Sequence, residues 1–127
     1  MPATAVAIPF LDLQAVNAPL ADELQAAVAR VIAGGQYVLG PEVERFEAGW
    51  AGATGARHCV GVGSGLDALT LALTAVGVGP GDEVIVPAHT FVATWLAVTH
   101  AGALPVGADV DPATGLLDPA AAAAAVT

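Results

Sequence analysis

A glycine-rich turn leads from a short apolar run into a helical pattern, and its residues could hold an anionic ligand. The segment Cys59–Leu73 reads CVGVGSGLDALTLAL. The first amides of a helix have no acceptor within that helix and point at an anion that lies before it. Those amides would belong to Gly65, Leu66 and Asp67. The chemistry predicted at this turn is phosphate binding, and a glycine turn without any ligand is the alternative.

Two common phosphate-binding motifs do not match this turn. The letters GVGSGL lack the last glycine of the dinucleotide-binding fingerprint, and no acidic residue ends a strand at the required distance. The Gly-Lys-Ser/Thr of a P-loop is missing as well. Neither a nicotinamide site nor a P-loop is therefore expected.

A regular alternation of strands and helices would position the turn. The predicted strands are residues 58–62, 83–86 and 104–108, and the predicted helices between them are residues 65–76 and 90–101. This order is typical of right-handed βαβ crossovers and of an α/β fold with a mostly parallel sheet. Loops that follow parallel strands share one edge of the sheet, so Gly63–Asp67 and Pro87–Phe91 are both expected at that edge.

A first helix is predicted before these strands. It begins after Asn17, whose side chain would cap it, and ends at Gly34 and Gly35. Its apolar residues recur at every fourth position: Leu20, Leu24, Val28 and Ile32. This spacing predicts one buried face.

A second helix starts at Pro41, because proline is favoured at the first helical position. Its Phe46 and Trp50 share one face and are expected to pack in the core. A last helix is predicted from Pro119 to Thr127, with the preceding aspartate as its N-cap.

The charge balance disfavours some classes of function. Twelve acidic residues against three arginines give a formal net charge of −9, which leaves no basic stripe for nucleic acid. No apolar run approaches the ~20 residues that span a bilayer, so no membrane partner is expected. The chain has one cysteine, which fits a reducing cytoplasm. Asp109 and Asp111 lack a third ligand nearby, so no metal site is predicted.

Five motifs resemble, in order and spacing, the opening third of the DegT/DnrJ/EryC1/StrS sugar aminotransferases. They are IPFLDL at 8–13, GGQYVLGPEVERFE at 34–47, HCVGVGSGLDAL at 58–69, GDEVIVPAHTFVAT at 81–94 and GALPVGADVDPATGLLDP at 102–119. The FLDL start, Asn17 and the GLDAL form are most similar to enzymes that aminate nucleotide-linked keto-deoxysugars, often at the 3-position. The resemblance implies a fragment of a fold-type I large domain, with an N-terminal helical segment (1–57) and the start of the cofactor-binding α/β domain (58–127).

The resemblance also implies a cofactor, pyridoxal 5′-phosphate (PLP). The matching turn at Gly65 would hold the cofactor phosphate through the amides of Leu66 and Asp67, with the Asp67 carboxylate pointing away from it. Ser64 would either add its hydroxyl or only stabilise the turn. Phe91 aligns with the aromatic residue that stacks on the pyridine ring in relatives.

Two further aromatic residues lie near the predicted site residues in the sequence or by the resemblance. Trp95 lies four residues after Phe91 on the same predicted helix face, where it could extend an apolar wall, and packing is the favoured role. Tyr37 lies in the loop 34–40, which the resemblance places near the substrate mouth and the interface between two subunits.

The family's chemistry needs a Schiff-base lysine and an aspartate beside the pyridine nitrogen, both downstream of the matched region. Lysine is absent from Met1 to Thr127, so this chain alone is expected to be inactive. The implied function is the N-terminal portion of a PLP-dependent aminotransferase, a cytoplasmic homodimer, that transfers an amino group from glutamate to a nucleotide-linked keto-deoxysugar. The alternatives are a sugar dehydratase of the same family, with histidine in place of that lysine, and a truncated non-catalytic protein that binds PLP or phosphate.

Overall fold

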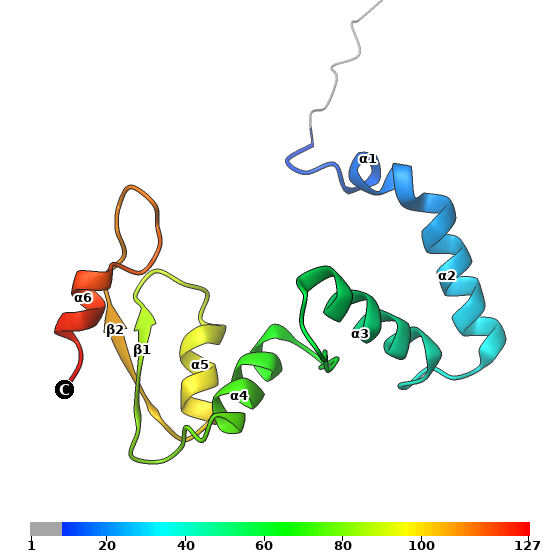
Figure 1. The fold of residues 1–127 in the computed structure, drawn as a ribbon. Coiled ribbons are helices and arrows are strands. Elements are labelled where there is room, and N and C mark those ends of the chain that lie inside the picture. Colours follow the sequence, from blue (N-terminus) through cyan, green and yellow to red (C-terminus); the bar gives the residue numbers. More distant parts are fainter. Residues whose placement is uncertain (1–8) are drawn as a thin grey trace, which may run out of the picture. The chain divides into compact units, whose positions relative to one another are not determined.

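The computed structural model describes residues 9–127, which divide after Gly61 into two compact units. Ile8, the first residue of the IPFLDL motif, lies outside the described residues. Among residues 9–61, helices are the only regular elements, whereas residues 62–127 combine helices with two strands (Figure 1). The domain division at residue 57 remains a prediction.

The described part of the first unit begins with α1 (Leu13–Asn17), a 3-10 turn η1 (Ala18–Leu20) and a long helix α2 (Ala21–Gly34). Asp12 caps α1, because its carboxylate accepts the amide of Ala15 at 2.9 Å. Asn17 has helical backbone angles and its side chain makes no capping hydrogen bond, so its prediction as an N-cap is wrong. The chain is already helical before Pro19, and Asn17 therefore ends α1 instead of opening α2.

Glycines follow both long helices of this unit. Gly35, after α2, adopts a φ of +66°, and its amide donates to the carbonyl of Val31 at 3.1 Å. This left-handed conformation is the usual end of a helix and suits glycine, which has no Cβ. Helix α3 (Pro41–Thr54) starts at Pro41 as predicted and is followed by Gly55 with a φ of +70°.

The apolar faces of α2 and α3 are exposed, and their predicted burial is wrong. The four apolar side chains that were predicted to form the buried face of the first helix are 50% to 63% exposed: Leu20, Leu24, Val28 and Ile32. Phe46 and Trp50 are each 56% exposed and stack on one another, with ring centroids 5.9 Å apart. Periodicity marks an apolar face, but burial also needs a second layer, and no layer covers these faces within residues 9–61.

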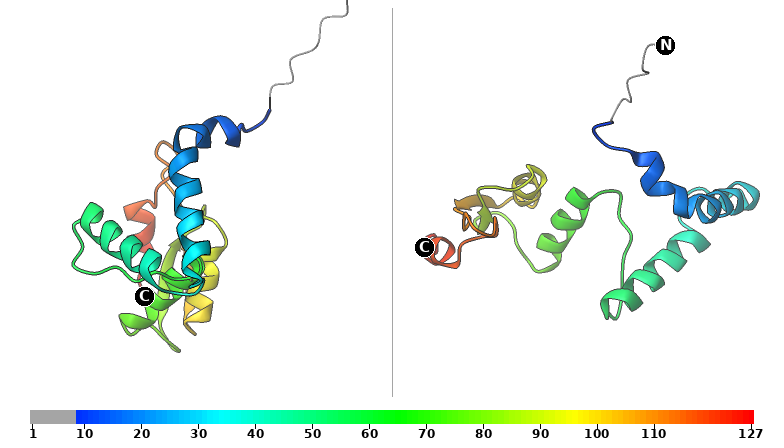
Figure 2. Two further views of the ribbon diagram at one scale, coloured as in Figure 1. Left: turned by 90° about the vertical axis from the view of Figure 1, so that its right-hand side faces the viewer. Right: turned by 90° about the horizontal axis from the view of Figure 1, so that it is seen from above.

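The second unit contains the predicted parallel pair of strands. Strands β1 (Glu83–Pro87) and β2 (Leu104–Ala108) pair in register, with Glu83 opposite Leu104 and Pro87 opposite Ala108. Helix α5 (Ala93–His100) connects them, and α4 (Gly65–Ala75) precedes β1 and packs against α5 (Figures 1 and 2). Helix α6 (Pro119–Ala124) follows, and the carboxylate of its N-cap, Asp118, accepts the amide of Ala120 at 2.8 Å. The α/β class is confirmed.

Three predicted elements need correction. Residues 58–62 form no strand, so the sheet within the described residues has two strands instead of three. A strand needs a hydrogen-bonded neighbour, and β1 and β2 pair with each other, not with this segment. Helix α5 starts at Ala93 and not at residue 90, and residues 90–92 belong to the preceding loop. Helix α6 ends at Ala124, and Thr127 leaves it to donate its hydroxyl to Glu83 at 3.0 Å.

A small apolar core holds the second unit together. Its buried members are Val86, Val98 and Ala103, and the partly buried side chains packed against them are Leu73, Val78, Val84 and Trp95. Side chains alternate along a strand, so Val84 and Val86 share one face of β1 while Ile85 lies on the other. The first of these faces packs on the helices, which fixes the end of β1 relative to the start of α5.

Candidate functional site

The predicted phosphate turn is a helix N-terminus closed by a pair of side chains. Ser64 is extended (φ −158°, ψ 165°) and is the N-cap of α4. Its Oγ accepts the Asp67 amide at 3.2 Å, and its hydroxyl donates to Asp67 Oδ2 at 2.8 Å. The pair is related to a capping box, in which the N-cap hydroxyl oxygen accepts a hydrogen bond from the amide three residues later. Its sequence signal is the Ser-x-x-Asp spacing at the start of a helix.

Two of the three predicted amide donors have no partner. Within residues 9–127, no hydrogen bond is formed by the amide of Gly65 or Leu66. The Asp67 amide is bound to Ser64, so the prediction that it is unpaired is wrong. The turn is open at Gly65, where an added Cβ would meet no atom within 4 Å.

The Asp67 carboxylate folds back over the turn, although it was predicted to point away. Its Oδ2 accepts the Ser64 hydroxyl and lies 3.1 Å from the position that a Cβ on Gly63 would occupy. The serine hydroxyl needs an acceptor, and the missing Cβ of Gly63 leaves room for one. The negative charge of the carboxylate stabilises the N-terminus of α4, but it repels any anion that binds at the same turn.

Phe91 lies in the loop between β1 and α5, and its side chain is 79% exposed. Its carbonyl accepts the Thr94 amide at 3.0 Å. The sheet edge that was predicted to carry both this loop and the turn at Ser64 is not formed, because residues 58–62 are not a strand. The structure thus gathers Ser64, Gly65, Leu66 and Asp67 in one turn, with Phe91 in a separate loop of the same unit.

Trp95 packs, as predicted. Its ring lies against the apolar core of the second unit. Its Nε1 donates to the carbonyl of Pro87, the last residue of β1, at 3.2 Å. The side chain therefore joins α5 to the end of the strand.

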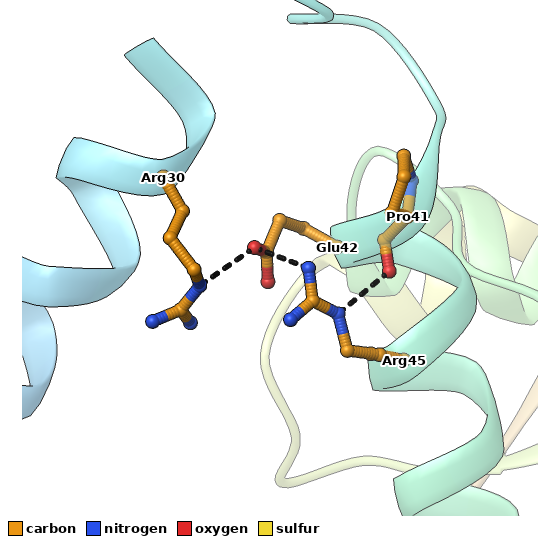
Figure 3. Close-up of polar contacts among 4 residues, drawn as sticks. All are labelled: Arg30, Pro41, Glu42 and Arg45. Carbon is orange, nitrogen blue, oxygen red and sulfur yellow. Dashed lines mark hydrogen bonds and ion pairs between the residues drawn. The ribbon is translucent and has the colours of Figure 1, made fainter. Parts of the chain in front are cut away.

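A polar cluster in the first unit joins α2 to α3 (Figure 3). Arg30 Nε donates to Glu42 Oε1 at 3.2 Å, and Arg45 Nη2 donates to the same oxygen at 2.6 Å. Arg45 Nε also donates to the carbonyl of Pro41 at 3.1 Å. The three charged side chains are 34% to 58% exposed, so solvent screens the pairs and their contribution to stability is small.

Residues 9–127 contain no cluster of three His, Cys, Asp or Glu side chains that could bind a metal ion. None of the helices in this part of the chain has the length and apolar character needed to cross a membrane.

Comparison with known proteins connects this sequence and fold to one family. The sequence profile of the DegT/DnrJ/EryC1/StrS aminotransferase family matches residues 19–127. The dTDP-3-amino-3,4,6-trideoxy-alpha-D-glucose transaminase of Streptomyces venezuelae is 52% identical over 120 residues, which cover 94% of this chain and 32% of that protein.

Two solved structures have the same fold over almost the whole chain. The crystal structure of Streptomyces venezuelae DesV in complex with a ketimine intermediate matches with a TM-score of 0.88 and 52% identity, covering 94% of this chain and 32% of that one. Bacillus subtilis NtdA with bound cofactor PMP matches with a TM-score of 0.87 and 31% identity, covering 99% of this chain and 29% of that one. The chain thus spans about a third of the length of the relatives it matches. By its sequence and its fold, the chain belongs to the DegT/DnrJ/EryC1/StrS aminotransferase family.

Proposed function

We propose that this chain binds the cofactor phosphate for a PLP-dependent nucleotide-sugar aminotransferase. In this reaction an amino group passes from glutamate to a nucleotide-linked keto-deoxysugar. The similarity to a dTDP-sugar transaminase over 94% of the chain supports this class of substrate. The observation that carries the proposal is the N-terminus of α4, where the amides of Gly65 and Leu66 have no partner among the described residues.

The donors at this turn fit a phosphate group. The cofactor of the family is PLP. Two backbone amides and one hydroxyl at a helix N-terminus are the donor types that bind phosphate in α/β proteins, and the helix dipole adds to the attraction. When bound, PLP supplies an electron sink for the pair of electrons released at the substrate carbon.

The Ser64–Asp67 pair has to rearrange for the third amide to reach a phosphate oxygen. The hydroxyl of Ser64 then releases both the Asp67 amide and the Asp67 carboxylate. It can donate instead to the phosphate, and the carboxylate turns away from the like charge. In this proposal Ser64 serves in two ways, as a helix cap without ligand and as a hydroxyl donor with it.

Phe91 is proposed to stack on the pyridine ring. Its exposed side chain offers a flat apolar face, and aromatic rings stack favourably on such a face. A ring in this place also keeps water from one side of the cofactor. Phe91 thus orients the ring, while the turn at Ser64–Asp67 fixes the phosphate.

One pair of variants tests the phosphate site. Gly65→Pro removes the amide of Gly65, and it suits the fold because proline is favoured at the first helical position and the preceding Ser64 is already extended. Binding of pyridoxamine 5′-phosphate (PMP) to the full chain, measured by calorimetry, should weaken about tenfold. Gly65→Ala keeps the amide and adds a Cβ into open space, so its affinity should equal that of the unchanged chain. Equal affinities for both variants would show that the Gly65 amide does not bind the phosphate.

The whole enzyme needs more than the matched region. The chain has no lysine, and we propose that it does not turn over glutamate and a keto-sugar by itself. A homodimer in the cytoplasm is proposed for the complete aminotransferase, with the loop 34–40 near the substrate. Tyr37 of that loop is 69% exposed, which leaves its side chain accessible to a ligand or a second subunit.

A further inference from the structure

The loop 88–92 is anchored by hydrogen bonds at both ends, although the side chain of Phe91 is 79% exposed. At its start, the Ala88 amide donates to a carbonyl of β2 at 2.8 Å, which continues the pairing of the two strands. At its end, the Thr94 amide donates to the Phe91 carbonyl at 3.0 Å, and the hydroxyls of Thr90 and Thr94 are hydrogen-bonded at 2.9 Å. An exposed ring on a backbone held in this way is suited to contact a flat partner.

Trp95 holds the same loop from within α5. Its Nε1 donates to the carbonyl of Pro87, one residue before the loop begins, at 3.2 Å. Its ring also packs against the core of the unit. Because the ring is held by the core, the hydrogen bond fixes the direction in which the chain leaves β1.

Gly107 provides the space that the Trp95 ring occupies. A Cβ on Gly107 would lie 2.8 Å from Cη2 and 3.3 Å from Cζ2 of Trp95. The first distance is shorter than carbon atoms tolerate, so a larger residue would displace the ring. The ring is thus confined by the backbone of β2 and by the core, and its Nε1 stays directed at Pro87.

We propose that Trp95 is the positioning residue for Phe91. Through the carbonyl of Pro87 it sets the course of the loop 88–92, and thereby the plane in which the Phe91 ring meets the pyridine ring of the cofactor. This inference rests on the proposed cofactor site. Trp95 acts through the loop and needs no contact with the ligand itself.

The test compares a ligand that has a ring with a ligand that has none. PMP carries a phosphate and a pyridine ring, whereas inorganic phosphate carries only the first, and both are titrated into the full chain by calorimetry. Trp95→Phe keeps an aromatic side chain but removes the Nε1 donor. It should weaken PMP binding about three- to tenfold and change phosphate binding by less than about twofold. Trp50→Phe, the same change in α3, should alter neither affinity.

A double variant shows whether Trp95 acts through Phe91. Phe91→Ala should weaken PMP binding at least as much as Trp95→Phe, and the variant with both changes should bind PMP as weakly as Phe91→Ala alone. Additive losses would overturn the inference. So would an unchanged PMP affinity in Trp95→Phe, or an equal loss for PMP and phosphate, which indicates general destabilisation.

The variant Thr94→Val and hydrogen exchange test the position of the loop independently of the core. Thr94→Val removes the hydroxyl pair at the other end of the loop without touching the core, and it should also weaken PMP selectively. Hydrogen exchange at the amides of Ala88 and Thr94 should become faster in Trp95→Phe and stay unchanged in Trp50→Phe. If the unchanged chain binds neither ligand, the proposed cofactor site fails. The exchange rates then still decide whether Trp95 holds the loop, and unchanged rates would contradict that role.

Discussion

At the scale of single residues, the turn at Ser64–Asp67 balances two uses of the same groups. The hydroxyl of Ser64 satisfies the Asp67 amide and carboxylate together, which stabilises the start of α4. The same carboxylate lowers the affinity of the turn for an anion, because like charges repel at short range. Asp67 is therefore expected to stabilise the helix at the expense of phosphate affinity.

Replacing Asp67 by asparagine should tighten anion binding. The variant Asp67→Asn removes the charge but keeps an oxygen that can accept the Ser64 hydroxyl. We expect the affinity for PMP to rise about three- to tenfold, the effect of one nearby charge at a solvent-exposed site. Calorimetric titration measures it. Asp118→Asn, the same change at the N-cap of α6, should leave the affinity unchanged. A weaker affinity in Asp67→Asn would show that the carboxylate itself contributes to binding.

At the scale of elements, the strand β2 and the helix α5 depend on one close contact. The ring of Trp95 reaches the position that a side chain on Gly107 would fill. The helix can therefore approach the sheet only where the strand has no side chain. This contact couples the packing of the core to the hydrogen bond between Trp95 and Pro87.

Adding a methyl group at Gly107 should destabilise the second unit. Gly107→Ala brings the new Cβ to 2.8 Å from the Trp95 ring, so the ring or the strand must shift. The free energy of unfolding, measured with urea, should fall by about 1–3 kcal/mol. Gly49→Ala adds the same methyl group inside α3, where nothing lies within 4 Å, and should raise the free energy of unfolding by up to about 1 kcal/mol. An equal effect of both substitutions would contradict the proposed contact.

At the scale of the whole molecule, most large apolar side chains of the described residues are exposed. Val86 and Val98, 3% and 1% exposed, are the large apolar side chains among them that are buried. Two apolar grooves run beside α2, one lined in part by Leu13 and Leu24 and the other by Val28 and Ile32. Exposed apolar surface of this extent binds other apolar surfaces. The isolated chain is therefore expected to bind hydrophobic dyes and to associate at high concentration.

Charged side chains in the groove at Val28 and Ile32 should reduce both dye binding and self-association of the chain. The double variant Val28→Glu and Ile32→Lys keeps the net charge and removes two exposed apolar side chains from α2. Dye fluorescence should fall by about half or more, and sedimentation should depend less on concentration. Ala26→Glu with Ala33→Lys introduces the same charges at positions that do not line either groove, and should change little. Equal reductions by both pairs would mean that charge alone controls association.

Several local features could be predicted from the sequence because they depend on neighbouring residues. Gly35 ends α2 in a left-handed conformation, and Pro41 opens α3. The unpaired amides of Gly65 and Leu66 follow from the geometry of any helix N-terminus. The family was also predictable, because its motifs preserve their order and spacing along the chain.

Other features depend on groups that the sequence does not place together. Residues 58–62 have the composition of a strand, but a strand exists only beside a hydrogen-bonded partner, and β1 and β2 pair with each other instead. Phe46 and Trp50 have the spacing typical of a buried helix face but remain exposed, because burial requires a second layer of structure. The sequence by itself determined the end of α2, the start of α3 and the family. Only the tertiary structure decided which strands pair, which apolar faces are covered and where the Asp67 carboxylate lies, because each of these depends on a partner in space.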